Sequence, residues 1–149
     1  MRISTRGEYG VRAMFDLAMH HGQGPIPLKV IAERQGISEH YLEQLVGAMR
    51  KAGLVTSVRG AQGGYQLADE PEAVRIGDII RTLEGPIAPM GCLDSDDGNC
   101  DQVERCATRI LWQKLQESME SVLDSTTLAD LCADAIRLKA KDDSFMYHI

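Results

Sequence analysis

The sequence predicts a mainly helical chain that carries one small β-hairpin and, towards its end, one long helix. Three observations lead to this expectation. Apolar residues recur at three- and four-residue spacing over most of the chain, one stretch alternates around a glycine-rich turn, and a second apolar stripe runs through residues 107–125. With 149 residues, of which 44% are hydrophobic, the chain is large enough to bury the core of one compact domain.

The first helix is predicted to begin at residues 4–5 and to run to about His20. Ser4 and Thr5 both suit an N-cap, and Thr5 with Glu8 has the spacing of a capping box. The sequence GQGP at 22–25 then interrupts the helix. Its apolar positions form one broad stripe, made of Tyr9, Ala13, Met14, Leu17 and Ala18.

Two further helices follow, separated by a short break. One runs from Pro27 to Gly36, and the next begins after the N-cap Ser38 and ends before Gly53. The apolar face of the latter consists of Leu42, Leu45, Val46 and Met49, and its polar face of His40, Gln44, Gly47 and Lys51. The break at 36–38 has the length found in a helix-turn-helix, although an ordinary helical hairpin fits these residues equally well.

A β-hairpin is predicted directly after these helices. Its strands are LVTSV at 54–58 and YQL at 65–67, joined by the turn RGAQGG. A hairpin in this position makes a winged helix. Arg59 lies beside Gly60 and Gly64, so little bulk prevents its guanidinium from entering a narrow minor groove. Pairing with a surface carboxylate is the alternative role for this arginine.

The second half of the chain is predicted to form a short helix at 78–84 and a long helix through residues 107–125. The long helix has an apolar stripe made of Ile110, Leu111, Leu115, Met119, Val122 and Leu123. A chain of this length can hardly cover the stripe alone. We therefore expect pairing with a second copy, and folding back onto the chain's own domain is the alternative.

One more helix is expected near the end of the sequence. Thr127 and Asp130 can cap it, and Cys132 lies on its apolar face, where it is expected to be a small core residue. The segment 141–149 is too short to classify.

Charge and composition limit the possible locations and partners. The opening residues lack the apolar segment of a signal peptide and no run of 18 apolar residues occurs, so we expect a cytoplasmic protein without a membrane partner. Residues 1–68 carry eight Lys and Arg against five Asp and Glu, whereas residues 69–149 carry eight against seventeen. This asymmetry is expected if only one end meets phosphate. The sequence contains no pattern of a nucleophile next to a base, no phosphate-binding loop and no carboxylate pair at a catalytic spacing, so we do not expect an enzyme.

Three of the four cysteines lie on one loop, GCLDSDDGNCDQVERC at 91–106. In a reducing cytosol, clustered cysteines act as metal ligands or redox groups rather than as disulfides. Thiolates suit iron-sulfur and zinc centres alike, but zinc favours a closed tetrahedral set, and His148 is the only histidine after His40. An iron-sulfur cluster, a zinc site and a thiol switch all remain open on this pattern.

The chain resembles the iron-sulfur-cluster regulator family of bacterial winged-helix transcription factors, the IscR type, with its NsrR and CymR relatives. The resemblance covers nearly the whole length and rests on STRGEYGVRAM, GISEHYLEQLVGAMRKAGLV, SVRGAQGGYQLA, the loop cysteines and ILW, while LEGPIAP and VLDSTTLADL are similar to CymR. It implies a homodimeric DNA-binding transcription regulator, acting as a repressor, whose affinity responds to an iron-sulfur cluster, 2Fe-2S rather than 4Fe-4S. The alternative is a cluster-free, CymR-like repressor of sulfur metabolism controlled by a partner protein or by thiol oxidation.

The resemblance also implies the metal ligands. Cys92, Cys100 and Cys106 would hold the cluster, with a C-x7-C-x5-C spacing whose first gap is longer than the x5 expected of IscR-type members. Those members place a histidine where this chain has Arg109, and a guanidinium has no lone pair to donate. NsrR-type members take a carboxylate from the first helix of the partner subunit, which corresponds here to Glu8; its alternative role is in the helix cap. The nearby acids Asp94, Asp96, Asp97, Asp101 and Glu104 are possible substitutes.

Roles in DNA binding are expected for the third helix and for the wing of each subunit, on an operator with two half-sites. The residues expected nearest the bases are Ser38, His40, Glu43 and Gln44. Those expected to hold phosphates are Tyr41, Arg50, Lys51 and the wing amides of Gly60 and Gly64, and Arg59 is expected in the minor groove. A carboxylate at Glu43 accepts only from a base donor such as cytosine N4, so it would also reject sites.

The expected organisation has three parts. They are a winged helix-turn-helix domain with a connecting helix at 1–84, a cysteine-bearing loop at 85–106, and the dimerisation and C-terminal helices at 107–149.

Overall fold

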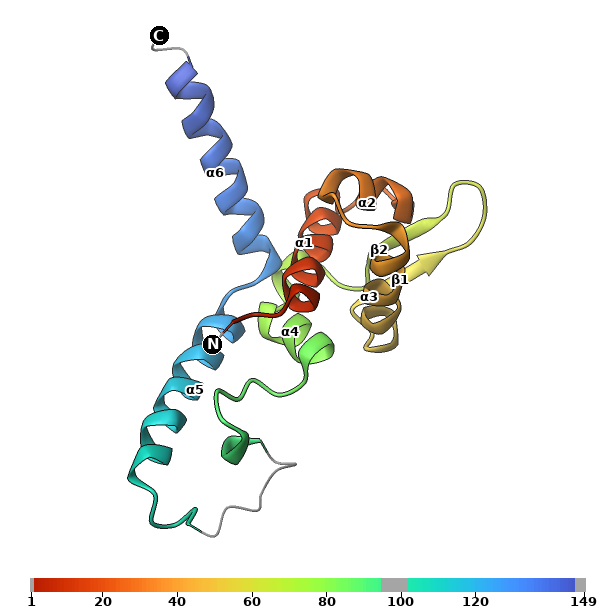
Figure 1. Ribbon diagram of the computed structural model, residues 1–149. Coiled ribbons are helices and arrows are strands. Elements are labelled where there is room, and N and C mark those ends of the chain that lie inside the picture. Colours follow the sequence, from red (N-terminus) through yellow and green to blue (C-terminus); the bar gives the residue numbers. More distant parts are fainter. Residues whose placement is uncertain (1, 95–101, 147–149) are drawn as a thin grey trace.

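The computed structural model describes residues 2–94 and 102–146, and it confirms a mainly helical fold with one hairpin (Figure 1). The elements in chain order are α1 Thr5–Met19, α2 Leu28–Gln35, α3 Glu39–Lys51, β1 Val55–Val58, β2 Gly64–Leu67, η1 Pro71–Ala73, α4 Ile76–Glu84, η2 Gly91–Leu93, α5 Ala107–Ser125 and α6 Leu128–Met146. The short 3-10 helices η1 and η2 were not predicted.

The helices α1 to α4 and the hairpin form one body, and α5 and α6 lie on the side of it away from the wing (Figure 1). The core lies where α1, α3 and α4 meet, and α6 adds Leu128, its first residue. The side chains of Met14, Leu42, Met49, Ile79 and Leu128 are completely buried. Burial of each such side chain contributes about 1.5–3 kcal/mol, so this core fixes the arrangement of the first four helices.

α1 begins where the sequence predicts and uses one of the two candidate caps. Ser4 is the N-cap, its Oγ accepting from the Gly7 N–H at 3.2 Å, and Thr5 is already helical, so the predicted Thr5–Glu8 capping box is wrong. Glu84 at the end of α4 replaces Glu8 as the second partner of the cap: its Oε1 accepts from the Ser4 N–H at 2.7 Å and also from the Ser4 hydroxyl. The helix cap therefore depends on a residue that is remote in sequence.

Two glycines allow α4 to lie close against α1. A Cβ at position 10 would fall 1.9 Å from Cδ1 of Leu83, and one at position 7 would fall 2.9 Å from Cδ of Glu84. Larger residues at these positions would push the helices apart or displace the Glu84 cap.

The helix-turn-helix forms as predicted. α2 ends at Gly36, whose φ of 65° is in the left-handed region, and α3 begins after Ser38, whose Oγ accepts from the Tyr41 N–H at 3.2 Å. Gly53, with a φ of 80°, follows the end of α3 and leads into the hairpin.

The wing is an antiparallel hairpin in which Val55 pairs with Leu67 and Val58 with Gly64. Ile26 forms an isolated antiparallel bridge with the hairpin, since its N–H and C=O bond with the C=O and N–H of Tyr65 at 2.9 and 2.8 Å. This pairing was not predicted. Gly64 makes it possible, because a Cβ there would lie 2.2 Å from the Ile26 oxygen.

The junction between α5 and α6 is tied to the body by backbone and side-chain bonds. The Ile76 N–H donates to the Thr126 oxygen at 2.9 Å, and the Leu128 N–H donates to the Val74 oxygen at 3.0 Å. Beside this junction, Arg81 of α4 donates to both carboxylate oxygens of Asp124 on α5, at 2.7 and 2.8 Å. The dimerisation helix predicted from sequence is thus held firmly against α4.

The capping box predicted for α6 is confirmed. The Thr127 N–H donates to Asp130 Oδ2 at 2.9 Å, and the Asp130 N–H donates to Thr127 Oγ1 at 3.2 Å. The helix continues to Met146, through part of the tail that the sequence left unclassified, and extends away from the body (Figure 1). Ile136 and Leu138 in this extension are 63% and 59% exposed.

Candidate nucleic-acid interface and cysteine site

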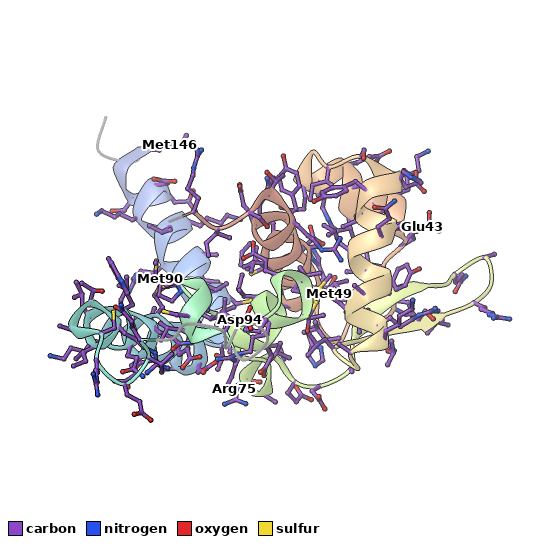
Figure 2. The ribbon with its side chains drawn as sticks, turned by 60° about the horizontal axis from the view of Figure 1, so that its bottom comes forward. Glu43, Met49, Arg75, Met90, Asp94 and Met146 are labelled. Atoms are coloured by element: carbon purple, nitrogen blue, oxygen red, sulfur yellow. The ribbon has the colours of Figure 1, made fainter. Side chains whose placement is uncertain are left out.

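α3 turns one face into the core and the other to solvent. Leu42, Leu45, Val46 and Met49 are completely buried. Figure 2 shows Glu43 and Met49 on opposite sides of the helix, with Met49 towards the body. The predicted base-reading residues are all exposed, namely Ser38, His40, Glu43 and Gln44. A Cβ at Gly47 would meet open space, so nothing in the described part of the chain covers this stretch of α3.

Tyr41 differs from its neighbours because the body of the protein holds its ring. The ring is half-buried and packs edge-on against Tyr9 of α1, with 6.0 Å between the centroids and 76° between the planes. A phosphate contact by Tyr41 would therefore come from an anchored side chain, which loses little entropy on binding.

The wing projects beyond the body next to α3, as both views show (Figures 1 and 2). At its tip the Gly63 N–H donates to the Gly60 oxygen at 3.0 Å, which closes a tight turn. Arg59 is exposed at this turn. Gly64 follows this turn as the first residue of β2 and lies against the Ile26 backbone, so this position requires glycine for packing whatever its amide binds.

The cations of this surface are exposed at the end of α3 and in the wing. In residues 2–94 and 102–146, no ion pair involves Arg50, Lys51 or Arg59. The basic side chains beside the exposed face of α3 are therefore available for phosphate, which carries most of the affinity of a DNA-binding protein.

Two of the three loop cysteines flank the part of the loop that is not described. Cys92 lies on η2, Cys106 is the N-cap of α5, and Cys100 falls outside the described residues. η2 packs against α5, so the two ends of the loop are attached to the same helix. Within the described residues, no group of three or more His, Cys, Asp or Glu side chains is arranged to hold a metal.

Cys106 and Cys132 have opposite electrostatic environments. The pKa of the Cys106 thiol is lowered, first by the Thr108 hydroxyl at 3.1 Å, then by backbone N–H groups at the start of α5, with a smaller effect of the Arg109 charge. The pKa of Cys132 is raised by burial and by Glu72. Cys132 is packed against the core, as predicted. Because metals bind the thiolate form, Cys106 suits a metal ligand and Cys132 does not.

Glu8 is exposed in the first turn of α1, and the cap role considered for it belongs to Ser4 and Glu84. Arg109 occupies the position where a histidine ligand would follow the last cysteine, and its Nε is buried without a hydrogen-bond partner among the described residues. The available donor set, two thiols with a third in the undescribed part of the loop, fits an iron-sulfur cluster with one ligand from elsewhere.

Pattern analysis missed the contacts that orient these elements. The Ile26–Tyr65 pairing and the Glu84 cap join segments that are remote in sequence, and the apolar Ile26 between the two prolines of GPIPL is the only local sign of the former. The burial of Asp16 on α1 was also missed, because one acidic residue between apolar positions suggests a solvent-facing side of the helix.

No helix in the described residues is both long enough and apolar enough to cross a membrane.

The chain matches the family model named Rrf2, described as an iron-dependent transcriptional regulator, over residues 3–134. It is 48% identical to the HTH-type transcriptional regulator CymR of Bacillus subtilis over 149 residues, which is 100% of both chains. The solved structure of that CymR, titled the global cysteine regulator, has a TM-score of 0.78 at 50% identity and covers 89% of this chain and 97% of its own. The structure of IscR from T. potens has a TM-score of 0.76 at 55% identity, with coverage of 91% and 88%.

These similarities agree with the geometry of the exposed recognition helix and wing. The relatives are named as transcriptional regulators and not as enzymes. The chain belongs to the Rrf2 family and is a DNA-binding transcriptional regulator.

Proposed function

We propose that the chain is a homodimeric regulator that acts as a repressor and whose DNA affinity responds to an iron-sulfur cluster held by Cys92, Cys100 and Cys106. The observation that carries the proposal is the division of the molecule into two surfaces. The polar face of α3 and the wing project on one side, and the exposed apolar face of α5 lies on the other (Figure 1). A cytoplasmic location follows from action on operator DNA.

The exposed face of α5 supports the homodimer. Ile110, Leu111 and Val122 are 57%, 56% and 63% exposed. An open groove of about 350 Å³ on this helix is lined by Ile3, Ser118, Met119, Val122 and Leu123. Contiguous apolar surface of this kind marks an interface. A second copy related by a two-fold axis would cover it and would place two copies of α3 on half-sites about 34 Å apart.

On each half-site, α3 would read the major groove. Its exposed residues Ser38, His40, Glu43 and Gln44 would lie nearest the bases, and Glu43 would favour cytosine N4 and repel acceptor-rich edges. Phosphates would be held by Tyr41, Arg50, Lys51 and the amides of Gly60 and Gly64. Arg59, exposed at the wing tip, would enter the flanking minor groove.

The environment of Cys106 supports the cluster. Its lowered pKa favours the thiolate form at the start of α5, and Cys92 lies on η2, which packs against the same helix. Glu8 of the partner subunit is the proposed fourth ligand, since it is exposed on α1 and Arg109 cannot serve. A bound cluster, with 2Fe-2S the expected form, supplies a centre that is sensitive to redox state and iron supply.

The contacts of α5 connect the cysteine-bearing loop to α4, which packs against α1 and α3. Cys106 is the N-cap of α5, and near the other end of this helix Asp124 binds Arg81 of α4. Gln116 between them donates to the Ile87 oxygen at 2.8 Å, which fixes the segment that leads to Cys92. A change in the position of the loop would thus reach α4 through a rigid helix.

A cluster-free repressor of the CymR kind is the alternative function. It is favoured by the identity of 48% to a CymR over the full length of both chains. In that case a partner protein or thiol oxidation would set the DNA affinity, and Cys106, with its lowered pKa, would be the reactive thiol.

Anaerobic purification with an absorption spectrum and an iron count separates the two functions. Coloured wild-type protein that loses its visible absorbance in Cys92→Ala and in Cys106→Ala supports the cluster. Cys132→Ala is the matched control, because it removes a cysteine packed against the core, and it should keep the colour. Colourless wild-type protein after reconstitution with iron and sulfide would favour the alternative. Colour that persists in both loop variants would place a cluster elsewhere.

A further inference from the structure

Asp16 on α1 is a buried carboxylate that neither the DNA-facing surface nor the cysteine site uses. It is 3% exposed and is the buried charged residue of the described core. Burial of a carboxylate is unfavourable unless it is paired and hydrogen-bonded. Its partners therefore show what it holds in place.

These partners come from the last turn of α2. Arg34 donates from Nε to Oδ2 at 3.1 Å and from Nη2 to Oδ1 at 2.6 Å, and Gln35 donates from Nε2 to Oδ2 at 2.9 Å. His20 completes the group: its Nδ1 lies 2.8 Å from the Asp16 carbonyl oxygen, and its Nε2 lies 3.3 Å from Nη1 of Arg34. Arg34 and Gln35 are the last two residues before Gly36, where the chain turns towards α3.

The same side of α1 also contacts α3. Arg12, one turn before Asp16, donates from Nη2 to the Gln35 carbonyl oxygen and stacks on the Tyr9 ring, with its Cζ 5.3 Å from the centroid. Tyr9 in turn packs against Tyr41 in the first turn of α3. One side of α1 thus contacts the end of α2 and the start of α3, the two helices that the turn connects.

The directional character of these bonds distinguishes them from the apolar core. Apolar contacts tolerate small rotations, whereas a bidentate Arg–carboxylate pair has a defined geometry. A rotation of roughly 10° at the turn moves Gln44, about 9 Å along α3, by about 1.5 Å, and it moves the far end of the helix, about 20 Å away, by about 3 Å. Either displacement takes a hydrogen bond to a base or a phosphate out of its range.

We propose that Asp16 is a positioning residue for DNA recognition: through Arg34 and Gln35 it fixes the turn of the helix-turn-helix and so sets the angle of α3. The proposal rests on the proposed reading of the major groove by α3. It assigns a function to the polar side of α1, a helix that does not itself face the DNA.

The test compares Asp16→Asn with Ile79→Val, a core variant on α4 remote from the turn, under conditions where both are fully folded. The first measurement uses no DNA. Amide hydrogen exchange at residues 37–41 should be at least tenfold faster in Asp16→Asn and unchanged in Ile79→Val. The second measurement compares binding to a duplex that the wild type selects from a random-sequence library with binding to a scrambled duplex. Asp16→Asn should reduce this preference at least tenfold, and Ile79→Val less than twofold.

Gln35→Ala serves if Asp16→Asn does not fold, since it removes one donor to Asp16 from a half-buried residue at the end of α2 and should shift both measurements in the same direction. Unchanged exchange at the turn, or unchanged preference in a folded variant, would overturn the proposal. If the wild type selects no duplex, the proposed function fails, and the exchange measurement alone still decides whether Asp16 orders the turn.

Discussion

At the scale of single residues, Arg59 gives the most direct test of the wing. Its guanidinium is exposed at a turn closed by the Gly63–Gly60 bond, and no acidic residue among those described pairs with it. Arg59→Ala should weaken binding to the selected operator about tenfold and reduce the preference for A·T-rich flanks, because a narrow minor groove attracts arginine.

Arg137→Ala is the matched control, since it removes the same charge from an exposed position on α6. Fluorescence anisotropy with operators that differ only in their flanks would measure both effects. Equal losses for the two variants would show that only net charge matters and that the wing does not enter the groove.

Residues with local signals were predictable and those with remote partners were not. Ser38 and the pair Thr127–Asp130 were recognised because a cap and its partner lie within three positions. Ser4 was only one of two candidate caps, and its partner Glu84 could not be recognised, because no local pattern relates residues 80 positions apart. The exposed residues of α3 followed from helical periodicity alone.

At the scale of elements, the attachment of α5 to α4 depends on Arg81 and Asp124. The Arg81 hydrogen bonds hold the pKa of Asp124 below its ordinary value, so the folded state binds this proton more weakly than the unfolded chain does. The pair therefore stabilises the protein above the pKa that Asp124 has in the unfolded chain. This contribution is lost as the pH falls through the lower pKa of the folded state.

Asp124→Asn should accordingly be less stable than the wild type at pH 7, and the difference should shrink as the solution is acidified below about pH 4. Both side chains are about one-third exposed, so solvent screening limits the loss to roughly 1 kcal/mol. Urea unfolding at several pH values measures it. Asp134→Asn is the control, because its pair with Arg137 lies on the exposed part of α6. A pH-independent difference for Asp124→Asn would argue against the linkage.

The elements themselves were largely predictable, and their assembly was not. Periodicity and caps identified α2, α3, the hairpin and α5, whereas the bridge between Ile26 and Tyr65 and the extension of α6 to Met146 depend on contacts or lengths that no local pattern contains. The same limit applies to the cysteine site. The sequence places Cys92 and Cys106 on one loop, but the attachment of η2 to α5 comes from packing.

At the scale of the whole molecule, the central question is whether α5 forms the interface between two copies. Leu111 and Val122 are more than half exposed and lie eleven positions apart, so helical geometry puts them on the same face. Covering both removes apolar surface from water in each subunit, and the groove beside Val122 continues the apolar patch to Ile3.

Leu111→Asp should therefore convert the dimer into a monomer, because it places a carboxylate in the centre of the apolar contact, while the fold of the monomer should remain because Leu111 is exposed. A monomer reaches only one half-site, so affinity for the two-site operator should fall at least about 100-fold. Affinity for a single half-site should be nearly unchanged.

Val58→Asp is the matched control: it puts the same charge on an exposed apolar residue of the wing, and it should remain dimeric but bind DNA less tightly. Sedimentation and operator titration of both variants test the division of the molecule into an assembly surface and a DNA-reading surface, and a Leu111→Asp protein that stays dimeric would contradict it.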